Sequence, residues 1–131
     1  MRGWSFGGYL SALAALRAPE RVHAAVAGAP VTSWYLYDTH YTERYLGHPE
    51  HHREHYERCD LTNEAGTLDR PLLLIHGLAD DNVVAAHTLQ FSTALLLRGD
   101  HHRRFDTLIC EIPSSESNAD DASGKGVFAT V

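Results

Sequence analysis

The feature that most constrains this chain is a serine set between glycines directly ahead of a helix-forming segment. In the sequence GWSFGG, Gly3 and Gly7 flank Ser5 two residues away on either side. Residues 7–17 are rich in Ala and Leu, and they end with a cationic residue shortly before Pro19. Ala and Leu favour helices, and a cation followed by a proline is a common helix end. The pattern predicts a tight turn at Ser5 and a helix over residues 7–17.

A serine on a strained turn before a helix has its hydroxyl exposed as a nucleophile. The residues two before and two after it must be small, because strand and helix approach closely there, and Gly3 and Gly7 meet this need. The backbone N–H of Phe6 would then point at the carbonyl under attack, and the helix N-terminus would add partial positive charge. The pattern favours Ser5 as a nucleophile; a glycine-rich turn with an incidental serine is the alternative.

The rest of the chain alternates apolar runs with helix-forming segments, which predicts strands with long connections between them. Such strands pair in parallel, so we predict an α/β domain over residues 1–113 with flanking helices. Residues 31–70 are expected to form irregular helical turns over one end of the sheet. The predicted strands cover residues 23–27, 71–75 and 105–112, and the predicted second helix covers residues 84–98.

Composition excludes several classes of protein. The 131 residues fit one domain, and 44% hydrophobic residues suffice for a packed core. A net charge of -6 offers no basic surface for nucleic acid. No apolar stretch or leader pattern predicts membrane insertion or export, so a cytoplasmic location is the default expectation. Cys59 and Cys110 are expected to be reduced thiols, and the polar residues 114–131 are expected to form a disordered tail.

A second chemical signal follows the apolar run 71–75, in the sequence HGLADDNV. In an α/β hydrolase the supporting acid comes after the nucleophile, at the carboxyl end of a later strand. Asp80 occupies that place. The alternative interpretation is that Asp80 and Asp81 cap the helix that begins near Val84.

An aromatic stripe accompanies these two signals. Trp34, Tyr37 and Tyr41 fall at i, i+3 and i+7, so on a helical turn they would share one face. Rigid aromatic walls suit a compact, flat ring such as proline. Taken alone, the stripe favours ordinary core packing.

Three separated motifs, GWSFGGY, AGAPVTSWYLYDTHYTERYLG and LLLIHGLADDNV, resemble the catalytic domain of the prolyl oligopeptidase family of serine peptidases, nearest to its dipeptidyl-peptidase IV branch. The resemblance runs from about Arg2 to Arg98. It implies a partial α/β-hydrolase fold whose front strands are absent, and a parent enzyme that cleaves peptides after proline or small residues through an acyl-enzyme. It implies no cofactor and no metal.

The resemblance also assigns roles to single residues. Ser5 matches the nucleophile, Phe6 the backbone N–H of the oxyanion hole, and Asp80 the triad acid. Asn82 matches an amide that holds a substrate carbonyl. The apolar pocket for proline is matched by Val31, Trp34, Tyr37, Tyr41 and Val83. In the family, a phenol from an upstream loop completes the oxyanion hole, and an upstream propeller domain recognises the free amino terminus of the peptide.

The triad histidine expected by the resemblance is not visible in the sequence. Residues 114–131, where it belongs, contain no histidine. His101 and His102 precede the last predicted strand, and His87 lies within a predicted helix, so all three are expected to lie away from the nucleophile. We therefore expect little or no turnover from the isolated chain.

A histidine-rich segment follows the aromatic stripe, with histidines at positions 48, 51, 52 and 55. His51 and His55 stand one helical turn apart and could share a zinc ion. The segment lacks the HExxH order and has no cysteine or acid at a convincing third position, so a solvated helix is the favoured interpretation.

Two further functions stay open at this stage. The chain could belong to another α/β hydrolase, such as an esterase, since the fold does not fix the substrate. It could also be a non-catalytic fragment that pairs its open sheet edge with a second copy, as a homo-oligomer.

Overall fold

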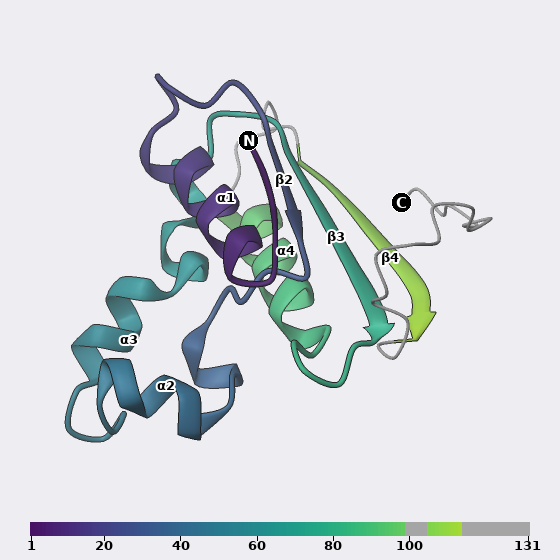
Figure 1. The fold of residues 1–131 in the computed structure, drawn as a ribbon. Helices are drawn as coiled ribbons and strands as arrows, with labels where there is room; N and C mark the ends of the chain where they lie inside the picture. Colours follow the sequence, from purple (N-terminus) through teal and green to yellow (C-terminus); the bar gives the residue numbers. More distant parts are fainter. Residues whose placement is uncertain (99–104, 114–131) are drawn as a thin grey trace.

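The computed structural model describes residues 1–98 and 105–113, with side chains described up to residue 110. Within these ranges four strands form one parallel sheet in the order β1-β2-β3-β4 (Figure 1). The strands are β1 (Arg2–Trp4), β2 (Ala25–Gly28), β3 (Leu72–Ala79) and β4 (Phe105–Pro113). The helices are α1 (Phe6–Arg17), α2 (Thr39–Leu46), α3 (Arg53–Cys59) and α4 (Ala86–Arg98), with the 3-10 helices η1 (Trp34–Leu36) and η2 (Leu61–Thr67). The predicted parallel α/β architecture is confirmed.

β1 was not among the predicted strands, and the predicted elements differ from the observed ones mainly at their ends. β3 continues past the predicted end at Ile75, because its pairing with β4 extends to Ala79. α4 begins at Ala86 instead of residue 84, since the preceding residues form a turn. The predicted tail over residues 114–131, together with His101 and His102, lies outside the described residues.

Register places the carboxyl ends of the strands at one edge of the sheet. Trp4 of β1 pairs with Gly28 of β2, and Gly28 pairs in turn with Ile75 of β3. Ser5 therefore leaves the sheet at the same edge as the end of β3. Adjacent strands lie about 4.8 Å apart, so β1 and β3 are about 10 Å apart across β2.

Two helices cover the same face of the sheet, α1 over β1 and β2 and α4 beside β3 (Figure 1). Right-handed connections between strands in sequential order place their helices on one face. Ala12 and Ala15 of α1 are fully buried, which lets the helix approach β2 closely, and Phe91 of α4 fills the core beside Leu74 of β3. Replacing Phe91 by Ala should cost about 3–5 kcal/mol, because the cavity left behind adds to the lost burial.

The segment between β2 and β3 is more regular than predicted, because two of its turns are α-helices. Asp38 caps α2 by accepting the N–H of His40 at 2.7 Å, and Gly47 ends that helix with φ of 78°. The segment is tied to the sheet layer where Ser33 donates to Asp60 at 2.6 Å and the Thr32 hydroxyl donates to the backbone of α4 at 2.7 Å. In Figure 1, α2 and α3 lie toward the end at which the arrowheads of β3 and β4 lie.

Both cysteines, Cys59 and Cys110, are half-buried free thiols, as predicted. In the part of the chain that the structure describes, no helix is both long and apolar enough to cross a membrane.

Candidate active site

Ser5 sits in a strained turn between β1 and α1. Its backbone has φ of 55° and ψ of -119°, a conformation that costs energy for any residue with a Cβ. The Ser5 N–H donates to the carbonyl of Gly28 at 2.8 Å, while the Ser5 carbonyl accepts the N–H of Tyr9 at 2.9 Å. The Ser5 nitrogen thus hydrogen-bonds to β2 of the sheet, and the Ser5 carbonyl hydrogen-bonds to the first turn of α1. These two bonds hold it at the bend.

The positions around this turn that have no room for a Cβ are Gly3 and Gly8, and not Gly7. A Cβ on Gly3 would overlap the backbone carbonyl of Gly7, so the need for glycine at position 3 is confirmed. A Cβ on Gly7 would meet nothing within 4 Å, so the expectation that this position needs glycine for lack of room is wrong. The tight helical position is Gly8, where a Cβ would lie 2.5 Å from the carbonyl oxygen of Gly28. Residue 8, and not residue 7, faces β2.

Phe6 begins α1, where backbone N–H groups have no partner within the helix. Among the described residues, its N–H has no backbone acceptor. The Phe6 ring is 49% exposed, and it packs against Trp34 and Tyr9 with ring centroids 6.0 Å and 5.8 Å away. The turn that presents the serine is thereby linked to the aromatic cluster.

Asp80 follows the last residue of β3 and organises the turn after it. Its Oδ1 accepts the backbone N–H of Asn82 at 3.0 Å and that of Val83 at 2.9 Å. Its Oδ2 takes no hydrogen bond from the described residues. α4 begins only at Ala86, so the alternative that Asp80 caps this helix is wrong. One carboxylate oxygen fixes the turn, and the other is free to hold a further donor.

The side chain of His76 hydrogen-bonds to the turn after β3. The ring is fully buried, and its Nε2 lies 2.6 Å from the carbonyl oxygen of Val83, which can only accept. Nε2 therefore carries the proton, and Nδ1 accepts the hydroxyl of Thr88 at 2.6 Å. His76 is therefore a packed, hydrogen-bonded residue within β3.

His87 is also fully buried, near the start of α4. Burial, together with the neighbouring His76, lowers the pKa of His87 to about 4. Its Nδ1 is 3.5 Å from the N–H of Ser33, and its Nε2 has no partner among the described residues. No histidine within residues 1–98 hydrogen-bonds to Ser5 or Asp80. The structure gives His87 no contact with the proposed nucleophile.

The three aromatic residues meet, but not on one helix as predicted. Trp34 lies in η1, Tyr37 has an extended backbone after it, and Tyr41 lies in α2. The cap residue Asp38 interrupts the helical path between them, so their spacing does not reflect one continuous helix. Their ring centroids are nevertheless 5.6–6.1 Å apart. Trp34 is 7% exposed and Tyr41 is 41% exposed, so the cluster opens to the surface and is not simply core.

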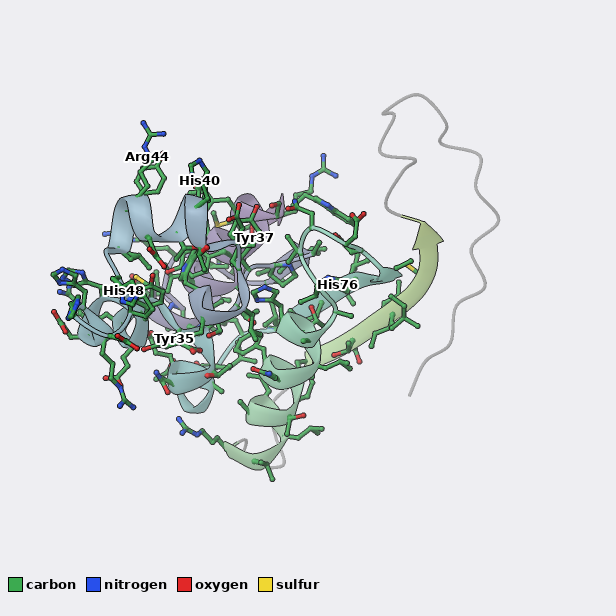
Figure 2. The ribbon with its side chains drawn as sticks, turned by 90° about the horizontal axis from the view of Figure 1, so that it is seen from below. Tyr35, Tyr37, His40, Arg44, His48 and His76 are labelled. Carbon is green, nitrogen blue, oxygen red and sulfur yellow. The ribbon has the colours of Figure 1, made fainter. Side chains whose placement is uncertain are left out.

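A hydrogen bond joins this cluster to the turn after β3. The hydroxyl of Tyr37 donates to Oδ1 of Asn82 at 3.2 Å. Figure 2 looks onto this end of the molecule, with Tyr37 and His76 labelled. Val31 and Val83 are 1% and 2% exposed, so they pack behind the cluster and offer a ligand little surface.

Sequence reasoning missed several residues that shape this edge. Gly28 receives the N–H of Ser5, and a Cβ on it would overlap the ring of Trp4. Ala29 has φ of 39°, a second strained residue beside the first. The sequence Gly28-Ala29-Pro30 signals only a turn, and the hydroxyl of Thr88 has no local pattern to reveal it. These contacts join segments that are distant in the chain.

A sequence profile of the prolyl oligopeptidase family matches residues 1–109. The chain belongs to this family. Dipeptidyl peptidase 8 from mouse and from human are each 45% identical over 91 residues, which are 67% of this chain and 10% of theirs. The solved structure of Porphyromonas gingivalis dipeptidyl peptidase 4 superimposes with a TM-score of 0.77 at 35% identity, covering 82% of this chain and 15% of that one. The chain thus spans about a tenth of the length of the curated relatives.

Proposed function

We propose that this chain carries the nucleophile and the supporting acid of a serine dipeptidyl peptidase that cleaves after proline or a small residue. The observation that carries the proposal is the backbone of Ser5, whose φ of 55° places the hydroxyl on a sharp bend between β1 and α1. Strain of this kind persists where the surroundings hold it, and it concentrates at functional sites. The names of the relatives, dipeptidyl peptidase 8 and dipeptidyl peptidase 4, support the activity.

In the proposed reaction, Oγ of Ser5 attacks the scissile carbonyl and passes its proton to a histidine base, for which no residue described in 1–98 is in place. The negative charge that develops on the carbonyl oxygen faces the N–H of Phe6 at the start of α1. The protonated base then gives its proton to the departing amine, leaving an ester on Ser5. Water hydrolyses that ester and frees the acid.

Asp80 has the geometry to hold such a base. Its Oδ1 is occupied by two backbone N–H groups, so the carboxylate is held in one orientation, with Oδ2 open. A carboxylate in this position fixes the tautomer of a histidine and stabilises its charged form. The neighbouring Asp81 is exposed and makes none of these backbone contacts.

The aromatic cluster of Trp34, Tyr37 and Tyr41 supports the proposed preference for proline. The Tyr37 ring lies at 90° to Trp34 and at 88° to Tyr41, whereas Trp34 and Tyr41 are stacked at 20°, so the cluster has walls facing two directions. Oδ1 of Asn82 is taken by the Tyr37 hydroxyl, which leaves its N–H2 group to donate to a substrate carbonyl. A substrate with proline at the cleavage position offers a flat ring to the aromatic cluster and a carbonyl to the amide of Asn82.

A chimera tests the proposal, because a full-length relative supplies the segments of the enzyme that this chain does not cover. Residues 1–98 replace the matching segment of mouse dipeptidyl peptidase 8, and hydrolysis of Gly-Pro-p-nitroanilide is compared with that of p-nitrophenyl acetate. We expect cleavage of the prolyl anilide. Ser5→Ala should remove it by about 10⁴-fold or more, and Asp80→Asn should reduce it by about 10⁴-fold. Asp81→Asn is the matched control and should leave it within about twofold.

The proposal fails if a folded chimera cleaves the prolyl anilide equally well with and without the Ser5 hydroxyl. Rapid hydrolysis of p-nitrophenyl acetate with none of the anilide would support the esterase alternative. Equal losses from Asp80→Asn and Asp81→Asn would remove the assignment of Asp80. Matched melting temperatures for the chimera and its variants separate these outcomes from misfolding.

A further inference from the structure

The histidine-rich segment at the α2–α3 junction contains a donor set that the sequence did not indicate. Ligand atoms of His52, Glu54 and His55 all lie within 4.8 Å of one another. The expectation that no acid stands at a third position is therefore wrong, since Glu54 lies between the two histidines. The spacing suggested His51 and His55 as a pair that could share an ion, although a solvated helix was favoured; in the structure His55 lies beside His52.

The ring of His55 is held in the tautomer that leaves Nε2 free to bind a metal ion. Its Nδ1 lies 2.8 Å from the carbonyl oxygen of Leu46, which can only accept, so Nδ1 carries the proton. Nε2 is left with its lone pair, and this atom is 3.7 Å from Oε1 of Glu54. Histidines that bind metals usually donate their second ring N–H to a carbonyl or carboxylate in this way.

The ring of His52 is held by packing. Gly47, at the end of α2, lies so close to this ring that a Cβ on it would overlap Cδ2 of His52. The rings of His52 and His55 are parallel within 2°, with centroids 5.1 Å apart. Nδ1 of His52 is 4.0 Å from the same Oε1 of Glu54 that faces His55. Both imidazoles are thus aligned on one carboxylate oxygen.

Charge and exposure at this place suit a cation. Glu54 supplies a negative charge, whereas the guanidinium of Arg53 is engaged by Glu57 at 2.6 Å. The side chains of His52, Glu54 and His55 are 48%, 66% and 45% exposed, so an ion can enter from solvent. In Figure 2, His48 of the same segment lies across the molecule from His76, so this cluster is remote from the turn that carries Asp80.

We propose that His52, Glu54 and His55 bind a divalent transition-metal ion, zinc above all, which ties the first turn of α3 to its cap residue. Two imidazoles and a carboxylate are ligands that zinc takes, with water completing the coordination. Bonds of about 2.0–2.2 Å place tetrahedral ligand atoms roughly 3.4 Å apart. The separations of 3.7 and 4.0 Å from Glu54 need only small side-chain movements to close on an ion.

Neighbouring residues provide matched controls. Nδ1 of His48 accepts the backbone N–H of Glu50 at 3.3 Å, so its remaining ring nitrogen carries a proton and has no lone pair to offer. His51 packs against His48 and belongs to no such donor group in the described chain. Glu57 is a carboxylate on the same helix that is already paired with Arg53. Substitutions at these three positions should not alter zinc binding.

The test is calorimetric titration of Zn²⁺ into the untagged 131-residue chain. We expect one ion per chain. His52→Ala, His55→Ala and Glu54→Gln should each weaken binding about tenfold or more, because losing even an outer contact of a metal site costs about 10–100-fold. His48→Ala, His51→Ala and Glu57→Gln should leave the affinity within about twofold. Zn²⁺ should also raise the melting temperature of the wild type, and a chelator should reverse this rise.

Nuclear magnetic resonance of the histidine ring nitrogens gives a second measurement that needs no substitution. Zn²⁺ should shift Nε2 of His55 and Nδ1 of His52 while leaving the ring nitrogens of His48 in place. Absence of binding, equal weakening by the target and control substitutions, or ring shifts at His48 and His51 alone would each overturn the proposal. None of these outcomes depends on peptidase activity, so the metal site and the proposed function succeed or fail separately.

Discussion

Replacing Ser5 by Gly should stabilise the chain relative to replacing it by Ala, although both substitutions remove the hydroxyl. The backbone at this position has φ of 55° and ψ of -119°, which is costly with a Cβ and ordinary for glycine. Strain of this kind is worth about 1–3 kcal/mol, and Ala retains it. Glycine costs about 0.5–1 kcal/mol through the greater freedom of the unfolded chain. The balance predicts that Ser5→Gly is about 1 kcal/mol more stable than Ser5→Ala.

Urea denaturation followed by circular dichroism measures this difference, and a thermal scan should show a gap of roughly 3–5 °C for a chain of this size. Ala14→Gly is the matched control, because Ala14 lies in the regular part of α1 and its carbonyl accepts the N–H of Ala18 at 2.9 Å. There the same change from Ala to Gly should destabilise by about 1 kcal/mol. If glycine destabilises equally at positions 5 and 14, the turn stores no strain and the reasoning is wrong.

Three further predictions concern the same edge of the sheet. Gly3→Ala should destabilise by about 2 kcal/mol or more in urea denaturation, because its Cβ overlaps a carbonyl, whereas Gly7→Ala should be neutral or stabilise by up to about 1 kcal/mol; equal effects would contradict the packing described. The neutral His87, with its pKa near 4 against about 6.5 when unfolded, contributes stability above pH 6.5 that is lost as the pH falls toward 4, up to about 3 kcal/mol. The free energy of unfolding should therefore decrease as the pH is lowered from about 6.5 to about 4. His87→Leu should flatten this pH dependence. If the substitution leaves the pH dependence unchanged, the ring is not buried in its neutral form. Tyr37→Phe in the chimera should raise KM for the prolyl anilide severalfold with a smaller change in kcat, since it frees Asn82 to move; a loss confined to kcat would speak against a positioning role.

The alternating pattern of the chain was sufficient to predict the parallel α/β sheet. Short apolar runs separated by long connections leave few other ways to pair the strands. The same logic located Asp80, since a polar residue directly after a buried strand lies at the carboxyl edge, where Ser5 also emerges. Both signals are local in sequence, so they could be read without coordinates.

The aromatic cluster shows where local patterns reach their limit. The spacing of Trp34, Tyr37 and Tyr41 predicted one shared helical face. In the structure Asp38 caps the start of α2, so no single helix carries all three, and their rings meet through tertiary packing. Their contact with Phe6 depends on how α1 sits beside η1. Side-chain spacing therefore gave the right neighbours for the wrong geometric reason.

The sequence by itself determined the chain order of β2, β3, β4, α1 and α4, the turn at Ser5 and the position of Asp80 after a strand, because these depend on hydrophobic period and on residues that favour turns. Only the tertiary structure decided that Gly8 and not Gly7 faces β2, that His76 locks the turn after β3, and that His52, Glu54 and His55 converge. The first two features depend on backbone groups distant in the chain, and the third depends on ring orientations that contacts with Leu46 and Gly47 set. The distances between such groups are set when the elements pack against one another, and no local run of residues encodes them.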